Sequence, residues 1–455
     1  MEPLLFAPEE TGGISLEDVF TAYMDCRRRK RGTYNALAFE VDWESRCADL
    51  WRRINDGSYR PLRSLVFIVK KPVMREVFAP SFESRVVDHL IARRIEPLLE
   101  ERFSDDSYST RKGKGTLFGI DRVQEHIRLC SHDYTRDCYI MKLDIRSFFM
   151  DLPKAELYGR MEAFLRGRYR GSDLPTLLYL LRVTYFDNPQ RDCVRRGPRS
   201  DWNGLPPGKS LFGSDGSRGL PIGRLTSQLG ALFYLDPLDH LVQEEWGVPH
   251  YGRYVDDMVF VHESREHLKE VAGWVGRWLA DNGLAIHPKK FYLQHYSKGV
   301  AFIGGMLLPG RRYISNRTLG FCRDALRRFN ALAESDPDFV YDHAEEFAAC
   351  MNSYLGCMKH FASYNLRRKI LLDGGMSPLW LKAVHIGGDS DKIAVKKRFR
   401  QRERLIREAR LIKKGREECG EPPLQPQFRR AVGAGVSGCP VGNGRRDAKA
   451  PMDRG

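Results

Sequence analysis

The sequence predicts an α+β fold in which helical segments at both ends flank a central region of short strands. Apolar residues recur at helical spacing over 15–60 and again from 316 to about 372. Between these segments, 138–145 alternates as a strand, with Tyr139, Met141 and Leu143 on one face. A hydrophobic share of 42% over 455 residues is enough to bury a sizeable core, which excludes wholesale disorder.

Charge and composition favour an intracellular protein with a polyanionic partner. Lys and Arg total 74 against 59 Asp and Glu, a net charge of +15, which favours nucleic acid over a membrane surface. No uncharged apolar run approaches the ~20 residues that cross a bilayer, and the acidic N-terminus lacks a signal-peptide pattern. The 10 cysteines form no C-x-x-C pair. We expect a cytoplasmic protein with no membrane partner.

The remaining elements follow from local patterns. The chain should form a β-hairpin with a basic tip from 64–69 and 75–78, and then a helix over 85–101. Further helices are expected over 225–243 and 264–282, and a strand over 302–308. Residues 186–218, rich in Gly, Pro, Asp and Arg, indicate a long surface insertion. Residues 391–416 predict a basic helix carrying Val395, and the Gly/Pro-rich chain after Cys419 predicts disorder.

The most informative segment is 250–262, in which two short strands flank an acidic turn at Asp256 and Asp257. Two adjacent carboxylates repel each other and raise each other's pKa. A bound divalent cation would relieve this repulsion. Alone, the pair would be an ordinary hairpin turn, where Asp is common. Asp144, however, ends a strand about 110 residues earlier. The three carboxylates could converge on two Mg²⁺ ions, which in such sites lie ~3.5–4 Å apart and promote phosphoryl displacement.

These residues belong to a series of motifs that resembles the reverse transcriptases. The resemblance covers about 20–370, and the motifs, in the order of that family, are Lys71-Pro-x-x-Arg75, Ser107-Tyr-x-x-Arg-Lys-Gly-Lys-Gly115, Asp144 with Phe148-Phe149, Gly219 to Gln228, Tyr254-Val-Asp-Asp257, Gly299 to Gly304 and Ser353 to His360. The tetrapeptide at 254–257 alone would not be specific, whereas the ordered set is.

The resemblance implies a role for each matching position. Asp144, Asp256 and Asp257 would be the catalytic and metal-binding residues for two Mg²⁺ ions, which Mn²⁺ could replace. The residues implied to bind the dNTP are Lys71, Arg75, Phe149 (the position that excludes a ribose 2′-OH), Ile222 and Gly223. Those implied to bind template or primer are Arg111, Lys112, Ser227, Gln228, Phe302, Gly304, Lys359 and His360. Without the match of the flanking motifs, Phe149 would be interpreted as a core residue. Lys71 and Arg75 would be interpreted as solvent-exposed residues at a hairpin tip.

The resemblance also implies a right-hand polymerase with α/β fingers, a palm with an antiparallel sheet, and a helical thumb. The expected divisions are N-terminal helices and fingers over 1–135, palm over 136–312, thumb over 313–388, and a basic helix with a disordered tail over 389–455. The implied partners are a template RNA, a DNA or RNA primer and dNTPs, and the basic helix would bind structured RNA or an accessory protein.

Departures from the general pattern narrow the subgroup. Pro221-Ile222-Gly223 stands where retroviral and intron enzymes usually have Pro-Gln-Gly, and Ser227-Gln228 follows. This form resembles the error-prone enzymes of diversity-generating retroelements, a resemblance that implies a bacterial or phage-encoded protein. The alternative is a bacterial antiviral defence enzyme, favoured by the 186–218 insertion and the basic tail. A non-catalytic RNA-binding protein on a palm scaffold is disfavoured because all three aspartates are present, and RNA-directed RNA synthesis is disfavoured by Phe149.

Overall fold

The computed structural model describes residues 13–28, 32–71 and 73–399. The chain divides into two units, Met1–Lys396 and Lys397–Gly455, and nearly all described residues belong to the first. Most of the basic helix predicted from the sequence, and the Gly/Pro-rich tail after it, lie outside the described residues. No described helix is long and apolar enough to cross a membrane.

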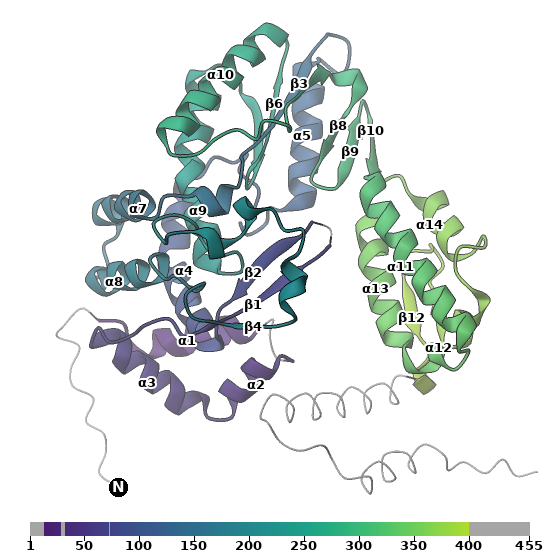
Figure 1. The fold of residues 1–455 in the computed structure, drawn as a ribbon. Coiled ribbons are helices and arrows are strands. Elements are labelled where there is room, and N and C mark those ends of the chain that lie inside the picture. The colour runs from purple at the N-terminus through teal and green to yellow at the C-terminus, as the bar shows by residue number, and fades with distance from the viewer. Residues whose placement is uncertain (1–12, 29–31, 72, 400–455) are drawn as a thin grey trace, which may run out of the picture. The chain divides into compact units, whose positions relative to one another are not determined.

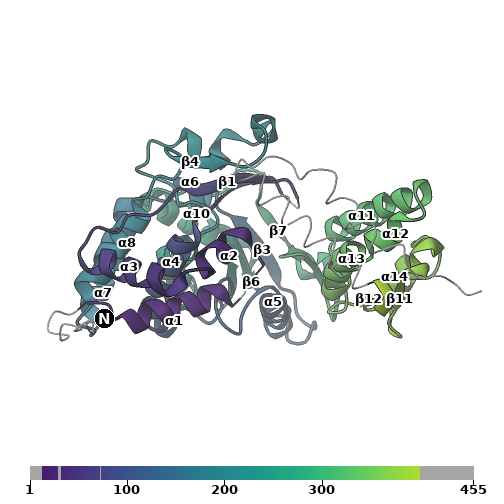
Figure 2. The same cartoon turned by 90° about the horizontal axis from the view of Figure 1, so that it is seen from below.

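Helices dominate the N-terminal part, as predicted. A capping box begins the first helix, because the Ser15 hydroxyl accepts from the backbone N–H of Asp18 and the Asp18 carboxylate accepts from that of Ser15. Helices α1 and α2 pack against α4, and α3 packs against α1 (Figure 2). Their bounds are α1 (Leu16–Arg27), α2 (Tyr34–Glu40), α3 (Trp43–Asn55) and α4 (Phe82–Arg102).

The central sheet is antiparallel, with strand order β5-β6-β3-β7. Its strands are β3 (Tyr139–Asp144), β5 (His250–Tyr254), β6 (Asp257–His262) and β7 (Tyr292–His295). The alternation predicted for 138–145 is present: Met141 and Leu143 join the main core, whereas Ile140 packs in a second core with α5 (Thr116–Cys130). In Figure 1 the strands β3 and β6 lie between α5 and α10. An α+β fold with an antiparallel sheet is therefore confirmed.

Helices from the middle of the chain also contribute buried residues to the main core. They are α6 (Phe148–Asp151), α7 (Lys154–Arg168), α8 (Leu174–Tyr185), α9 (Leu225–His240) and α10 (Arg265–Asp281). Helix α9 is buried along most of its length and continues into a π-helical turn at Leu241–Glu245. The helices predicted over 225–243 and 264–282 are both confirmed.

The predicted hairpin forms from β1 (Ser64–Val69) and β2 (Arg75–Ala79), which pair antiparallel. The insertion is more than the surface loop that the sequence predicted. Its strand β4 (Cys193–Arg195) pairs parallel with β1 and extends the sheet to the order β2-β1-β4. Three short 3₁₀ turns follow, at Arg199–Trp202, Pro207–Lys209 and Leu211–Gly213. The segment therefore forms part of this sheet and its core.

A third sheet precedes the C-terminal helices. Its strands are β8 (Val300–Phe302), β9 (Gly305–Leu308) and β10 (Arg311–Ile314), in the order β10-β9-β8. The single strand predicted over 302–308 is wrong, because Ile303 and Gly304 have φ values of 35° and 93° and turn the chain. The predicted C-terminal helices are confirmed as α11 (Asn316–Ser335), α12 (Phe339–Asp342), α13 (Ala344–Met358) and α14 (Tyr364–Leu371).

The start of the predicted basic helix is also wrong. Residues Ile393–Val395 form β12, which pairs antiparallel with β11 (Val384–Ile386). Ile393 and Val395 are buried, and the Asn352 side chain on α13 bonds both the N–H and the carbonyl of Ile393. Alternating β-branched residues that pack on a helix favour a strand over a continued helix.

Candidate active site

The three aspartates of the acidic motifs meet at one end of the central sheet. Asp144, the last residue of β3, lies directly opposite Asp257, the first residue of β6. Asp256 precedes Asp257 in the β5–β6 turn, and its carbonyl accepts from the N–H of Ile145 at 3.3 Å. Asp144 is buried, whereas the other two are half-buried. Residues more than 110 positions apart therefore form one acidic group.

The carboxylates strongly influence one another. Burial, followed by the charges of Asp144 and Asp257, raises the pKa of Asp256 to about 6. Two lysines partly balance the group. Lys290 Nζ lies 2.6 Å from Asp144 Oδ2, and Lys142 Nζ lies 3.2 Å from Asp257 Oδ1.

The donor set fits a hard divalent cation. Within residues 13–28, 32–71 and 73–399, no three His, Cys, Asp or Glu side chains are gathered tightly enough to form a metal cage. An open set of carboxylates nevertheless suits Mg²⁺, which binds through a few of them and keeps its other positions for water and substrate phosphate. Asp144, Asp256 and Asp257 are the residues that would hold it, because their mutual repulsion is the feature that a cation relieves.

The acidic turn is held in an unusual backbone conformation. Val255 has a φ of 59°, which is rare for a β-branched residue and is strained. The buried Arg253 donates from Nη1 to the Val255 carbonyl at 3.0 Å, and its Nε donates to Asp239 on α9 at 2.7 Å. Tyr251 also donates to Asp239, at 2.8 Å. A buried network thus fixes the turn that carries Asp256.

Phe149 lies on the short helix α6, five residues after Asp144. The residue before this helix, Ser147, has a left-handed backbone conformation with a φ of 47°. The Phe149 ring is half-buried and lies 5.5 Å, centroid to centroid, from that of Phe148. The Phe149 carbonyl accepts from the N–H of Leu220 at 2.7 Å. This bond connects the Asp144 segment to the motif that begins at Gly219.

Ile222 and Gly223 pack against β2. The Ile222 carbonyl accepts from the N–H of Phe78 at 2.8 Å. Gly223 has a φ of 122°, and a Cβ there would lie 2.7 Å from the Phe78 carbonyl oxygen. Only glycine fits such a position without strain. Backbone hydrogen bonds therefore join the segment 219–223 to β2 and to the short helix that follows Asp144.

A family model described as reverse transcriptase (RNA-dependent DNA polymerase) matches residues 68–307, more than half of the chain. The chain belongs to the reverse transcriptase family. No curated protein sequence matches the chain.

Solved telomerase structures are similar at low identity. Telomerase from Candida albicans in complex with a TWJ fragment of telomeric RNA is 13% identical with a TM-score of 0.40, covering 66% of this chain and 55% of that one. Apo telomerase from Candida tropicalis is 12% identical with a TM-score of 0.42, covering 68% and 59%. The chain thus spans little more than half of the length of those telomerase chains. With TM-scores below 0.5, the similarity adds nothing to the family assignment.

In this chain, Lys71 and Arg75 lie on the β1–β2 hairpin and are both exposed. Lys71 Nζ lies 5.5 Å from the centre of the Phe321 ring on α11. Pro72, between them, lies outside the described residues. Both side chains are therefore open to solvent, and their role in binding a triphosphate stays a prediction.

The other residues implied to bind nucleic acid differ in exposure. Arg111 is buried, and its guanidinium contacts Glu100 at 2.8 Å and the Ser107 carbonyl at 3.0 Å, so in this conformation it holds its own loop. Ser227 and Phe302 are also buried. The half-buried or exposed positions are Lys112, Gln228 (bonded to Thr110), Gly304 in its turn, Lys359 and His360.

Sequence reasoning missed three residues of this site. Lys142 and Lys290 contact the carboxylates, and Arg253 fixes the turn. Lys142 could have been found, since it lies two residues before Asp144 on the same strand face. Nothing in the local sequence indicates that Lys290, two residues before β7, contacts Asp144 on the neighbouring strand β3.

Proposed function

We propose that the chain is an RNA-directed DNA polymerase that makes cDNA from an RNA template by nucleotidyl transfer. The observation that carries the proposal is the meeting of Asp144, Asp256 and Asp257 at one end of the central sheet, within a chain of the reverse transcriptase family. The proposed partners are a template RNA, a DNA or RNA primer and dNTPs.

In the proposed reaction, the primer 3′-OH attacks the α-phosphorus of a dNTP and pyrophosphate leaves. Two bound Mg²⁺ ions, replaceable by Mn²⁺, would supply charge neutralisation at the attacking and leaving oxygens. Asp144, Asp256 and Asp257 would bind these ions at the end of the central sheet. Exposed Lys71 and Arg75 would neutralise the triphosphate, and the Phe149 ring would exclude a ribose 2′-OH.

The right-hand division accompanies this proposal. Residues 1–135 would be N-terminal helices and fingers, 136–312 the palm, and 313–388 the thumb. The positively charged segment from 389 onward would bind structured RNA or an accessory protein. A deletion from residue 400 should weaken RNA binding most at low salt, and equal loss at all salt concentrations would contradict this role.

The experiment is primer extension by the full chain on an RNA template, with dNTPs and NTPs compared. We expect extension with dNTPs only, and loss of product when the template is digested with RNase before primer addition. Extension with NTPs as fast as with dNTPs would contradict the role of Phe149. No extension on RNA, with extension on DNA, would contradict the RNA-directed activity.

For the biological system, we infer the error-prone enzyme of a diversity-generating retroelement, with antiviral defence as the alternative. Ile222 supports the inference, because an aliphatic side chain there lacks the amide of glutamine that could position a nucleotide or template. The insertion and the basic tail favour the alternative.

Sequencing of cDNA made by the native ribonucleoprotein distinguishes the two systems. Substitutions concentrated at template adenines would support diversification, and Ile222→Gln should reduce them. Faithful copies, concatemers or simple repeats would support defence. Unchanged adenine errors in Ile222→Gln would contradict the role of Ile222.

A further inference from the structure

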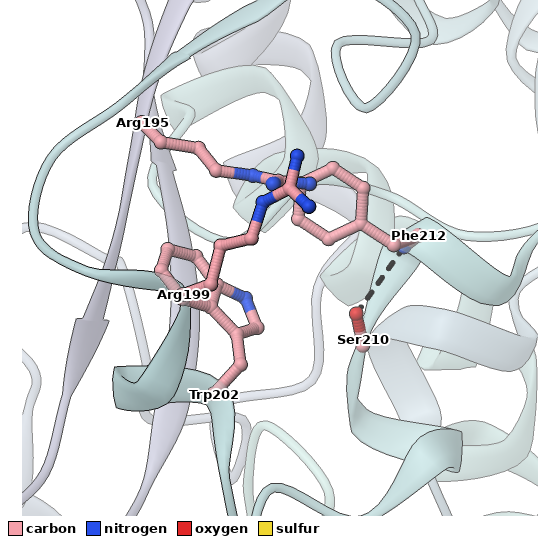
Figure 3. Close-up of a pocket in the computed structure, with 5 residues that line it drawn as sticks. All are labelled: Arg195, Arg199, Trp202, Ser210 and Phe212. Carbon is pink, nitrogen blue, oxygen red and sulfur yellow. Dashed lines mark hydrogen bonds between the residues drawn. The ribbon is translucent and has the colours of Figure 1, made fainter.

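The insertion forms a pocket whose lining residues have no role in the proposed polymerase reaction. Its volume is about 380 Å³, and its lining residues all come from the insertion: Arg195, Arg199, Trp202, Ser210 and Phe212 (Figure 3). Two guanidinium groups and two aromatic rings therefore line one small hollow.

The pocket is built on a buried carboxylate. Glu76 on β2 is fully buried and accepts from Trp202 Nε1 at 2.7 Å, Ser210 Oγ at 2.9 Å and the Leu211 N–H at 2.8 Å. These three bonds fix the indole and the 3₁₀ turns, while β4 holds Arg195 at the edge of the sheet. The pocket is therefore fixed to the hairpin that carries Lys71 and Arg75.

Within the described residues, the arginines of the pocket have no carboxylate partner. Three of the four acids of the insertion pair with bases outside it: Asp187 with Arg224 at 2.9 Å, Asp192 with Arg63 at 2.7 Å, and Asp201 with Lys70 at 2.7 Å. The fourth, Asp215, accepts from the N–H and hydroxyl of Ser217. Across the described part of the chain, neither Arg195 nor Arg199 forms an ion pair, and both are exposed.

Both guanidinium groups nevertheless belong to one small pocket. Arg195 lies over the Phe212 ring, 4.7 Å from its centre, and Arg199 is a further lining residue of the same hollow. Two like charges that line one small pocket repel each other, and a bound anion relieves that repulsion. A second cavity of the molecule, also lined by arginines and aromatic rings, differs in this respect, because its Arg102 and Arg160 pair with Asp236 and Glu156.

We propose that this pocket binds one nucleotide unit of a single-stranded RNA. The backbone phosphate would lie between the guanidinium groups of Arg195 and Arg199, since planar guanidinium suits phosphate oxygens. The base would stack on the exposed part of Trp202, an interaction that tolerates any sequence. The choice of RNA over DNA rests on the proposed function, whereas the phosphate-and-base chemistry rests on the pocket.

The first test is equilibrium binding of a fluorescent uridine dodecamer to the full chain, without dNTPs. We expect Arg195→Gln/Arg199→Gln to weaken binding about tenfold and to lower the salt slope by about 0.7 for each phosphate that the protein no longer neutralises. The control is Arg168→Gln/Arg170→Gln, which removes the same charge from exposed positions at the end of α7. Equal weakening in both double variants would overturn the proposal.

A second test uses the unmodified chain. The dodecamer carrying 4-thiouridine, irradiated on the protein and mapped by mass spectrometry, should crosslink within 195–212. Crosslinks only elsewhere would overturn the site. A thymidine dodecamer that binds at least as tightly would overturn the choice of RNA. Since neither test needs polymerisation, failure of the proposed function would show separately, in primer extension.

Discussion

Arg253 and Asp239 form a fully buried ion pair directly beneath the acidic turn, and Arg253 also donates to the carbonyl of Val255. The same arginine therefore joins α9 to the strained residue that precedes Asp256. The geometry of the site depends on this interior charge pair as much as on the aspartates themselves.

Asp239→Asn should lower the free energy of unfolding by about 3 kcal/mol or more, because it leaves the Arg253 guanidinium buried without a countercharge. Urea denaturation measures the change. Asp281→Asn, at the exposed end of α10, is the control and should stay within about 0.5 kcal/mol. Asp239→Asn as stable as the control would contradict the importance of the pair.

Gly223→Ala should destabilise the protein and slow polymerisation, because its Cβ would lie 2.7 Å from the Phe78 carbonyl oxygen. Gly204→Ala is a matched control. Gly204 also has a positive φ, 87°, but nothing lies within 4 Å of its Cβ position. The comparison isolates the steric clash from the backbone strain, and we expect an additional loss of at least about 1 kcal/mol in thermal unfolding. Equal losses would show that β2 can move away from Gly223.

Lys290→Met should make the protein more sensitive to Mg²⁺. Lys290 balances Asp144 at 2.6 Å, so its removal leaves more uncompensated negative charge for a cation to stabilise. We expect the rise in Tm on adding Mg²⁺ to be about 2 °C larger than in the wild type. Lys289→Met removes an exposed neighbouring charge and should behave as wild type. A smaller Mg²⁺ response in Lys290→Met would contradict the account.

Asp106 should make stability depend on acid pH. Burial would raise its pKa, but hydrogen bonds from His126 and Arg122 hold the pKa well below its ordinary value. A lowered carboxyl pKa stabilises the fold above the unfolded pKa of about 4, and the stabilisation is lost as pH falls further. Asp106→Asn should therefore be less stable than wild type at pH 7, with a gap that narrows between pH 4 and pH 2. Urea midpoints across this range measure it, and a gap that widens in acid would refute the assignment.

Local patterns were enough to predict the elements that carry the aspartates. The strand ending at Asp144 alternates cleanly, and the apolar residues on each side of Asp256 define a hairpin. The pairing of these strands came from the resemblance, because no local rule brings residues 144 and 257 together.

The rest of the site depends on interactions between residues that are distant in sequence. In the sequence, Glu76 is an isolated acid in a predicted strand. Only the fold shows that its carboxylate accepts hydrogen bonds from Trp202, Ser210 and Leu211. The resemblance implies that Arg111 binds template or primer, yet in the fold its guanidinium pairs with Glu100. The local pattern around Val395 predicts a helix, whereas in the fold Val395 pairs with Val384 and belongs to a strand.

The most direct test of the account is primer extension on an RNA template by Asp256→Asn, with RNA affinity measured on the same preparation. We expect the extension rate to fall at least about a hundredfold, and RNA affinity to stay within about twofold of wild type, since the change removes one charge without altering side-chain shape. The Asp281→Asn control should extend primers normally. Extension by Asp256→Asn at the wild-type rate would contradict the assignment of the acidic group as the active site.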